Sequence, residues 1–155
     1  MTGPRWLDDE EAHSWRSFLR MHQVLRATLE RELTRETGLS LPDYEVLVNL
    51  SEAAGQRLRM WALADALQWS RSRLSHQVAR MQDRGLLSRE DCPTDARGAF
   101  ATLTPFGLAA IESAAPGHLA GVRRHLFDRL SAEQVRALAE ISEAVLGPVP
   151  DADPC

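Results

Sequence analysis

Lysine is absent from this 155-residue chain, and all 18 of its basic residues are arginines. Without lysine there is no Walker-A phosphate loop and no Schiff-base or pyridoxal phosphate chemistry. The sequence also lacks the H-E-x-x-H and G-x-S-x-G motifs and any glycine-rich phosphate loop. We therefore do not expect an enzyme.

Cysteine and histidine are scarce. The two cysteines, Cys92 and Cys155, fit neither a disulfide framework nor a zinc-ligand spacing. No two of the five histidines have the i, i+4 spacing that places two imidazoles on one helical face. No stretch resembles a signal peptide or a membrane-spanning run. We expect no metal and no cofactor, and a reducing, cytoplasmic setting.

Apolar residues recur mainly with helical spacing. We expect helices over about 11–37, 40–54, 61–67, 70–84, 104–126 and 131–146, several of them preceded by a Ser or Thr that can cap the helix start. Two short strands are expected at 86–89 and 99–103, around a turn-rich segment. The fold class is mainly α with a small β-hairpin, in which two helices joined by a tight turn precede a wing.

Positive charge is concentrated in the middle of the chain. Residues 57–89 contain seven arginines and two aspartates, whereas the whole chain has a net charge of −4. A basic surface on an acidic body is typical of a nucleic-acid-binding protein, although a solvated surface without function is the alternative.

The helix expected from Ser70 has one apolar face. Successive turns bring Leu74, Val78 and Met81 together, and the opposite face carries small polar and cationic residues. Such a face fits the major groove, where arginine forks to guanine and small polar residues contact bases or phosphates. The candidate DNA contacts are Ser70, Arg71, Ser72, Arg73, Ser75, His76, Gln77 and Arg80.

The hairpin tip contains Asp95 and Arg97. An arginine on a narrow protrusion can enter the minor groove, and a nearby aspartate can orient its guanidinium. The alternative is a turn in which the aspartate caps its own backbone.

These motifs together resemble the MarR family of winged helix-turn-helix transcription regulators. The resemblance rests on SRSRLSHQVARM at 70–81, RGLLSR at 84–89, DAR at 95–97 and LTPFG at 103–107, with Leu63 and Ala64 before them. It implies a homodimer that binds a pseudo-palindromic operator in duplex DNA, usually to repress transcription. It also implies a single domain, with dimerisation helices at about 10–38 and 104–147, a DNA-binding lobe at about 40–103 and a wing at about 86–103. In the family pattern Arg97 contacts the minor groove and Asp95 orients it.

Many members of this family respond to small aromatic acids or phenols. Residues that could line a crevice for such an effector are Trp15, Arg16, Phe18, His22, Tyr44 and Trp61. Aromatic residues at helical spacing are more often ordinary core. Oxidant sensors of the family usually carry a reactive cysteine near the chain start, a position that Cys92 does not match.

The sequence therefore predicts a cytoplasmic, homodimeric transcriptional regulator, more often a repressor, whose affinity for its operator falls when a small ligand binds. Two alternatives stay open. One is a winged-helix module that binds a protein, and the other is an architectural DNA-binding protein without sequence preference.

Overall fold

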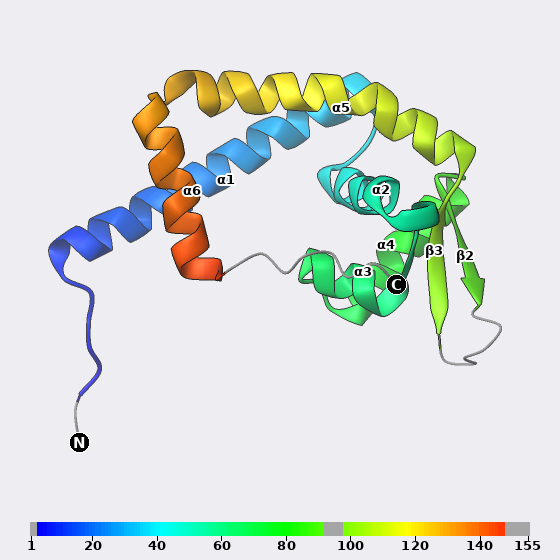
Figure 1. The fold of residues 1–155 in the computed structure, drawn as a ribbon, viewed down its shortest axis with the longest axis horizontal. Coiled ribbons are helices and arrows are strands. Elements are labelled where there is room, and N and C mark those ends of the chain that lie inside the picture. The colour runs from blue at the N-terminus through cyan, green and yellow to red at the C-terminus, as the bar shows by residue number, and fades with distance from the viewer. Residues whose placement is uncertain (1–2, 92–97, 148–155) are drawn as a thin grey trace.

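The computed structural model describes residues 3–91 and 98–147, so Cys92, Asp95 and Arg97 lie outside the described residues. Helices make up most of this part of the chain (Figure 1). The helices are α1 (Asp9–Thr37), α2 (Leu41–Glu52), α3 (Met60–Leu67), α4 (Arg71–Asp83), α5 (Pro105–His125) and α6 (Ala132–Leu146), with single 3₁₀ turns at Ala54–Gln56 and Phe127–Arg129. The strands are β1 (Arg57–Arg59), β2 (Leu87–Asp91) and β3 (Ala99–Leu103). This arrangement confirms the predicted fold class.

Side-chain caps fix where the helices begin. The predicted caps at Ser40, Ser70, Thr104 and Ser131 are confirmed, because each side-chain oxygen accepts a hydrogen bond from a backbone N–H in the first turn. At α1 a capping box formed by Asp8 and Glu11 starts the helix at Asp9, two residues before the expected position.

The chain has two parts, which Figure 1 shows side by side. Helices α1 and α5 run along one another, with α6 descending from the end of α5, whereas α2, α3, α4 and the strands form a lobe. Arg124 and His125 of α5 bind Glu32 of α1 at 2.7 and 2.9 Å. The hydrogen bond with His125 and the charge of Arg124 hold the pKa of Glu32 below its usual range.

The sheet is antiparallel, with strand order β1-β3-β2. The predicted hairpin is confirmed, and its register pairs Leu87 with Leu103 and Asp91 with Ala99. Strand β1 was not predicted. Its arginines extend over the Phe100 ring, with the guanidinium carbons of Arg57 and Arg59 at 4.8 and 5.0 Å from the ring centroid.

The hydrophobic core lies in the lobe. Large side chains that are almost fully buried come from α2, α3, α4 and β2: Val46, Leu47, Leu50, Leu63, Leu74, Val78, Met81 and Leu87. By contrast, α6 buries no residue, and α1 buries only Leu29 and Leu33. The core therefore holds the lobe together and leaves long parts of the outer helices without partners in the single chain. Within the described residues, no helix combines the length and apolar character needed to span a membrane.

Candidate nucleic-acid interface

Helix α4 is fixed to the lobe by its apolar face. Leu74, Val78 and Met81 are at most 1% exposed. The start of the helix is set by Ser70, whose hydroxyl oxygen accepts a hydrogen bond from the Arg73 backbone N–H at 3.2 Å. This burial settles which side of α4 faces outward.

The outward side of α4 carries most of the predicted contacts. Exposed residues are Ser70, Arg71, Ser72, Arg73, His76 and Arg80, and Ser75 is half-buried. Small side chains alternate here with guanidinium groups, so the backbone of α4 can approach a groove closely while the arginines reach phosphates or base edges.

Gln77 departs from the prediction. Its side chain is only 4% exposed, and its amide nitrogen donates a hydrogen bond to Asp43 Oδ1 at 2.6 Å. The reason lies in its angular position, which borders the apolar face and meets the start of α2. We therefore remove Gln77 from the candidate DNA contacts.

A large cavity, of about 750 Å³, lies among α1, α2, α3 and α5. Of the predicted effector residues it contains His22 and Tyr44. Its full lining is His22, Leu25, Arg26, Leu29, Leu41, Tyr44, Glu45, Val48, Asn49, Ala66, Leu67, Gln68, Trp69, Arg73 and His118. Arg26 and Glu45 form an ion pair at 2.8 Å within it. The cavity thus combines aromatic walls with charged groups.

Arg73 lies between this cavity and the outward face of α4. Its position in the first turn of α4 is exposed, yet its guanidinium carbon sits 4.1 Å from the centroid of the Trp69 ring. Both residues line the cavity. Arg73 therefore touches the edge of the cavity from α4, the candidate recognition helix.

A smaller cleft, of about 210 Å³, separates α4 from the hairpin. Trp61, predicted to line an effector crevice, lies here instead and is 54% exposed. Trp61 lies in the first turn of α3, on the side that meets the hairpin and not α1. The cleft is lined by Met60, Trp61, Arg71, Leu74, Ser75, Arg89, Gly98 and Ala99. The cleft therefore brings the Trp61 ring close to Arg71 of α4 and Arg89 of β2.

Trp15, Arg16 and Phe18 are not part of the large cavity. They occupy the half of α1 that runs beyond the lobe, where Trp15 and Phe18 are 52% and 51% exposed. Their rings stack along the helix, with centroids 5.9 Å apart, and Phe18 in turn stacks on His22. The stacked aromatic rings therefore begin at His22, which lines the cavity, and extend along α1 away from it.

Several residues of both sites carried no signal in the sequence. His118 reaches the cavity from α5, Trp69 lies in the turn before α4, and Asp43 meets α4 from the start of α2. Each contact depends on how distant helices cross, which local periodicity does not encode.

Strand pairing and helix packing together define a winged helix-turn-helix domain of the kind found in DNA-binding transcription regulators. A MarR family model matches residues 37–98. The chain belongs to the MarR family of transcriptional regulators, which is not a class of enzymes.

Solved structures of relatives extend over almost the whole chain. The MarR family regulator Sco3205 from Streptomyces coelicolor, crystallised in complex with DNA, is 44% identical, with a TM-score of 0.88 over 98% of this chain and 96% of its own. AbsC from the same organism is 45% identical, with a TM-score of 0.83 over 94% of this chain and 100% of its own. The transcriptional regulator HosA of Escherichia coli O111:H- is 27% identical over 132 residues, which cover 79% of this chain and 96% of HosA.

Proposed function

We propose that this regulator is a homodimeric repressor, located in the cytoplasm, which binds a pseudo-palindromic operator in duplex DNA and releases it when a small ligand binds. The observation that carries the proposal is the division of α4 into a buried apolar face and an exposed face of arginine and serine. The 44% identity to Sco3205, crystallised with DNA, supports it. Arg97 and Asp95 are proposed as the minor-groove contact and its orienting partner.

The homodimer is supported by the apolar residues left uncovered on the outer helices. Phe18, Leu119, Ile141 and Val145 are between 51% and 78% exposed. Segments of about 10–38 and 104–147 would pack against a second copy. A two-fold dimer buries these residues and presents two α4 helices to half-sites about 34 Å apart or a multiple of it.

The ligand is proposed to be a small aromatic acid or phenol held in the 750 Å³ cavity. Tyr44, Trp69 and His118 supply flat surfaces, and Arg73 supplies positive charge for a carboxylate, whereas the charge of Arg26 is paired with Glu45. Because Arg73 belongs to α4, a ligand here would touch the recognition helix directly.

Footprinting on DNA that flanks the coding region, with and without a panel of aromatic acids, tests this proposal. We expect a protected two-fold site that at least one acid weakens. Competition against random duplex separates the alternatives: a specificity ratio near one indicates an architectural protein, and no affinity for any duplex indicates a module that binds protein.

A further inference from the structure

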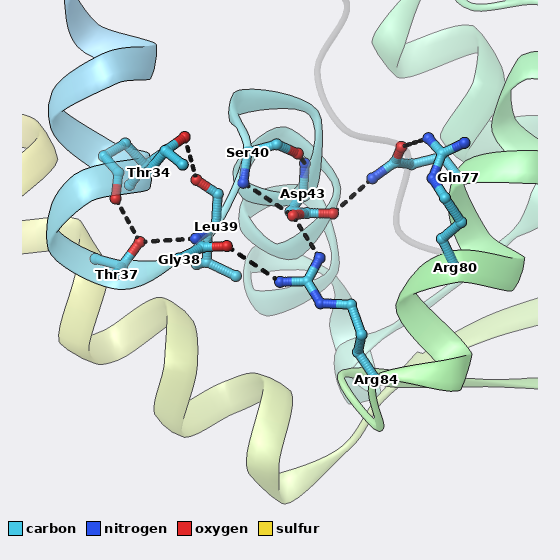
Figure 2. Close-up of polar contacts among 10 residues, drawn as sticks. Thr34, Thr37, Gly38, Leu39, Ser40, Asp43, Gln77, Arg80 and Arg84 are labelled. Atoms are coloured by element: carbon cyan, nitrogen blue, oxygen red, sulfur yellow. Dashed lines mark hydrogen bonds and ion pairs between the residues drawn. The ribbon is translucent and has the colours of Figure 1, made fainter.

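Asp43 is a buried carboxylate that connects the start of α2 to the recognition helix. It is 3% exposed. Figure 2 shows its three donors: the backbone N–H of Ser40 at 2.9 Å, the Arg84 guanidinium at 2.7 Å and the Gln77 amide at 2.6 Å. A buried charge is tolerated only when its oxygens are occupied in this way.

The network continues from Asp43 toward the exposed face of α4. Gln77 Nε2 donates a hydrogen bond to Asp43, and Gln77 Oε1 accepts a hydrogen bond from the guanidinium of Arg80. On the other side, Arg84 also donates to the Gly38 carbonyl at 3.4 Å, at the end of α1. An unbroken chain of polar contacts therefore runs from the corner between α1 and α2 to an exposed arginine (Figure 2).

Asp43 determines the donor-to-acceptor direction of this network of hydrogen bonds. A carboxylate only accepts hydrogen bonds, so the Gln77 amide must present its NH₂ to it. The amide oxygen then necessarily points away, toward Arg80. The charge of a residue in the interior thus determines which group the exposed arginine meets.

Anchoring α4 does not require this extension. The pair of Asp43 with Arg84 and the buried apolar face already hold the helix. A hydrogen bond to an exposed arginine adds little to stability, but it restricts the conformations of a long side chain before binding. Such preorganisation lowers the entropy lost when the guanidinium meets DNA.

We infer that Asp43 and Gln77 are positioning residues for DNA recognition, which hold Arg80 in the orientation in which it meets the operator. The inference rests on the proposed function in one respect, that Arg80 contacts DNA. Neither Asp43 nor Gln77 touches DNA itself, since both side chains are buried.

A double-mutant cycle tests this inference. Affinity is measured for the wild type, Gln77→Met, Arg80→Ala and the combined variant, on the tightest duplex recovered from a random library by repeated selection. We expect Gln77→Met to weaken binding about two- to tenfold, as one ordered side chain becomes free. In the Arg80→Ala background the same change should have no further effect.

Val78→Ala is the matched control. Val78 follows Gln77 in α4, is 1% exposed and has no polar side chain. Any decrease in DNA affinity that it causes through the fold should be the same with and without Arg80. If the Gln77→Met effect also persists unchanged without Arg80, the network only holds the helix and the inference is overturned.

A charge exchange supplies a second, independent test. In Asp43→Asn the Gln77 amide turns to accept from the new NH₂ and points its own NH₂ at Arg80, so affinity and the preference for individual base pairs should both change. Adding Gln77→Glu restores an acceptor toward Arg80 and should recover both. Failure of this rescue in a folded double variant contradicts the inference.

The inference and the proposed function fail in different ways. If Arg80→Ala alone binds the selected duplex as tightly as the wild type, Arg80 does not contact DNA and both are wrong at this residue. If Arg80→Ala weakens binding but the two changes are additive, the role of Arg80 in DNA binding stands and only the positioning role is refuted.

Discussion

The imidazole ring of His118 packs on the ring of Tyr44, with centroids 4.3 Å apart and planes tilted by 40°. This contact joins α5 to α2 beside the large cavity. Burial lowers the pKa of His118, and burial, followed by the charge of Glu52, raises the pKa of Tyr44. Both rings are therefore held in their neutral forms, and His118 Nδ1 is buried without a hydrogen-bond partner in the described chain.

This contact predicts a decrease in stability in mild acid. Because the pKa of His118 is lower in the folded chain than the ordinary value of 6.5, the unfolded chain takes up the proton first as pH falls. The free energy of unfolding should therefore decrease once pH drops below about 6.5, until the folded pKa is passed. Urea unfolding between about pH 8 and pH 5 measures this slope.

The variant His118→Gln should flatten that slope, since glutamine does not titrate. Asn49→Gln is the control, because Asn49 lines the same cavity and does not titrate, so this variant should keep the wild-type slope. An unchanged slope in His118→Gln would assign the acid sensitivity to other groups.

A second prediction concerns Gly107, where the first turn of α5 passes close to the backbone just before β2. A Cβ built there would lie 1.8 Å from the backbone oxygen of Leu86 and 2.9 Å from a Leu103 methyl. Thr104 stabilises this close contact, since its hydroxyl donates a hydrogen bond to the Gly85 carbonyl at 2.6 Å. Gly107→Ala should lower the free energy of unfolding by about 1–3 kcal/mol or more, because backbone must move.

Gly117, in the same helix, is the matched control. A Cβ there meets only the end of the flexible Glu36 side chain, at 3.1 Å. Gly117→Ala should therefore stabilise the protein by up to about 1 kcal/mol through helix propensity. Thermal unfolding of the two variants should shift in opposite directions, and a shift of Gly107→Ala in the stabilising direction would refute the close approach.

Local signals in the sequence identified all six α-helices of the described residues. Ser70 before a run with apolar spacing, and Ser131 with Gln134, located helix starts because capping is a matter of neighbouring residues. Strand β1 was not predicted from the sequence, because Arg57, Leu58 and Arg59 form a strand only by pairing with β3.

The site was predictable only where one helix determines it. The outward face of α4 follows from the burial of Leu74 and Val78, and most residues on it were identified. Gln77 was misplaced because its partner, Asp43, lies in another helix. The residues of α1 that line the cavity are His22, Leu25, Arg26 and Leu29, which lie further along the helix than most of those predicted. No periodicity tells where the lobe begins to cover a long helix.

A third prediction concerns the salt dependence of DNA binding. Each phosphate neutralised contributes a slope of roughly −0.9 in log K against log salt. With Arg71, Arg73 and Arg80 exposed on each of two copies of α4, a dimer should give a steep line. In Arg71→Ala the slope should become shallower by roughly one for each phosphate that this arginine neutralises in the wild type, as measured by fluorescence anisotropy. A flat response of the wild type contradicts an electrostatic interface.

The fourth prediction concerns Arg97, proposed to enter the minor groove. Arg97→Ala should weaken binding with little change in base preference, because the minor groove distinguishes few base pairs. Arg136→Ala is the control, since Arg136 lies on α6, outside the DNA-binding lobe. Equal affinities of Arg97→Ala and the wild type for the selected duplex would exclude this role for Arg97.

The last prediction concerns assembly. Helix α6 has apolar residues at Ile141 and Val145, 62% and 78% exposed, and Phe18 of α1 is 51% exposed. Exposed apolar groups at helical spacing are costly in water, so a second copy should cover them. Ile141→Asp with Val145→Asp should shift sedimentation from dimer to monomer and weaken DNA binding, because one recognition helix then has to bind alone.

Glu140→Ala with Glu143→Ala is the matched control on the same helix and should leave the dimer intact. A monomeric wild type at micromolar concentration, with full operator affinity, would refute the two-fold arrangement.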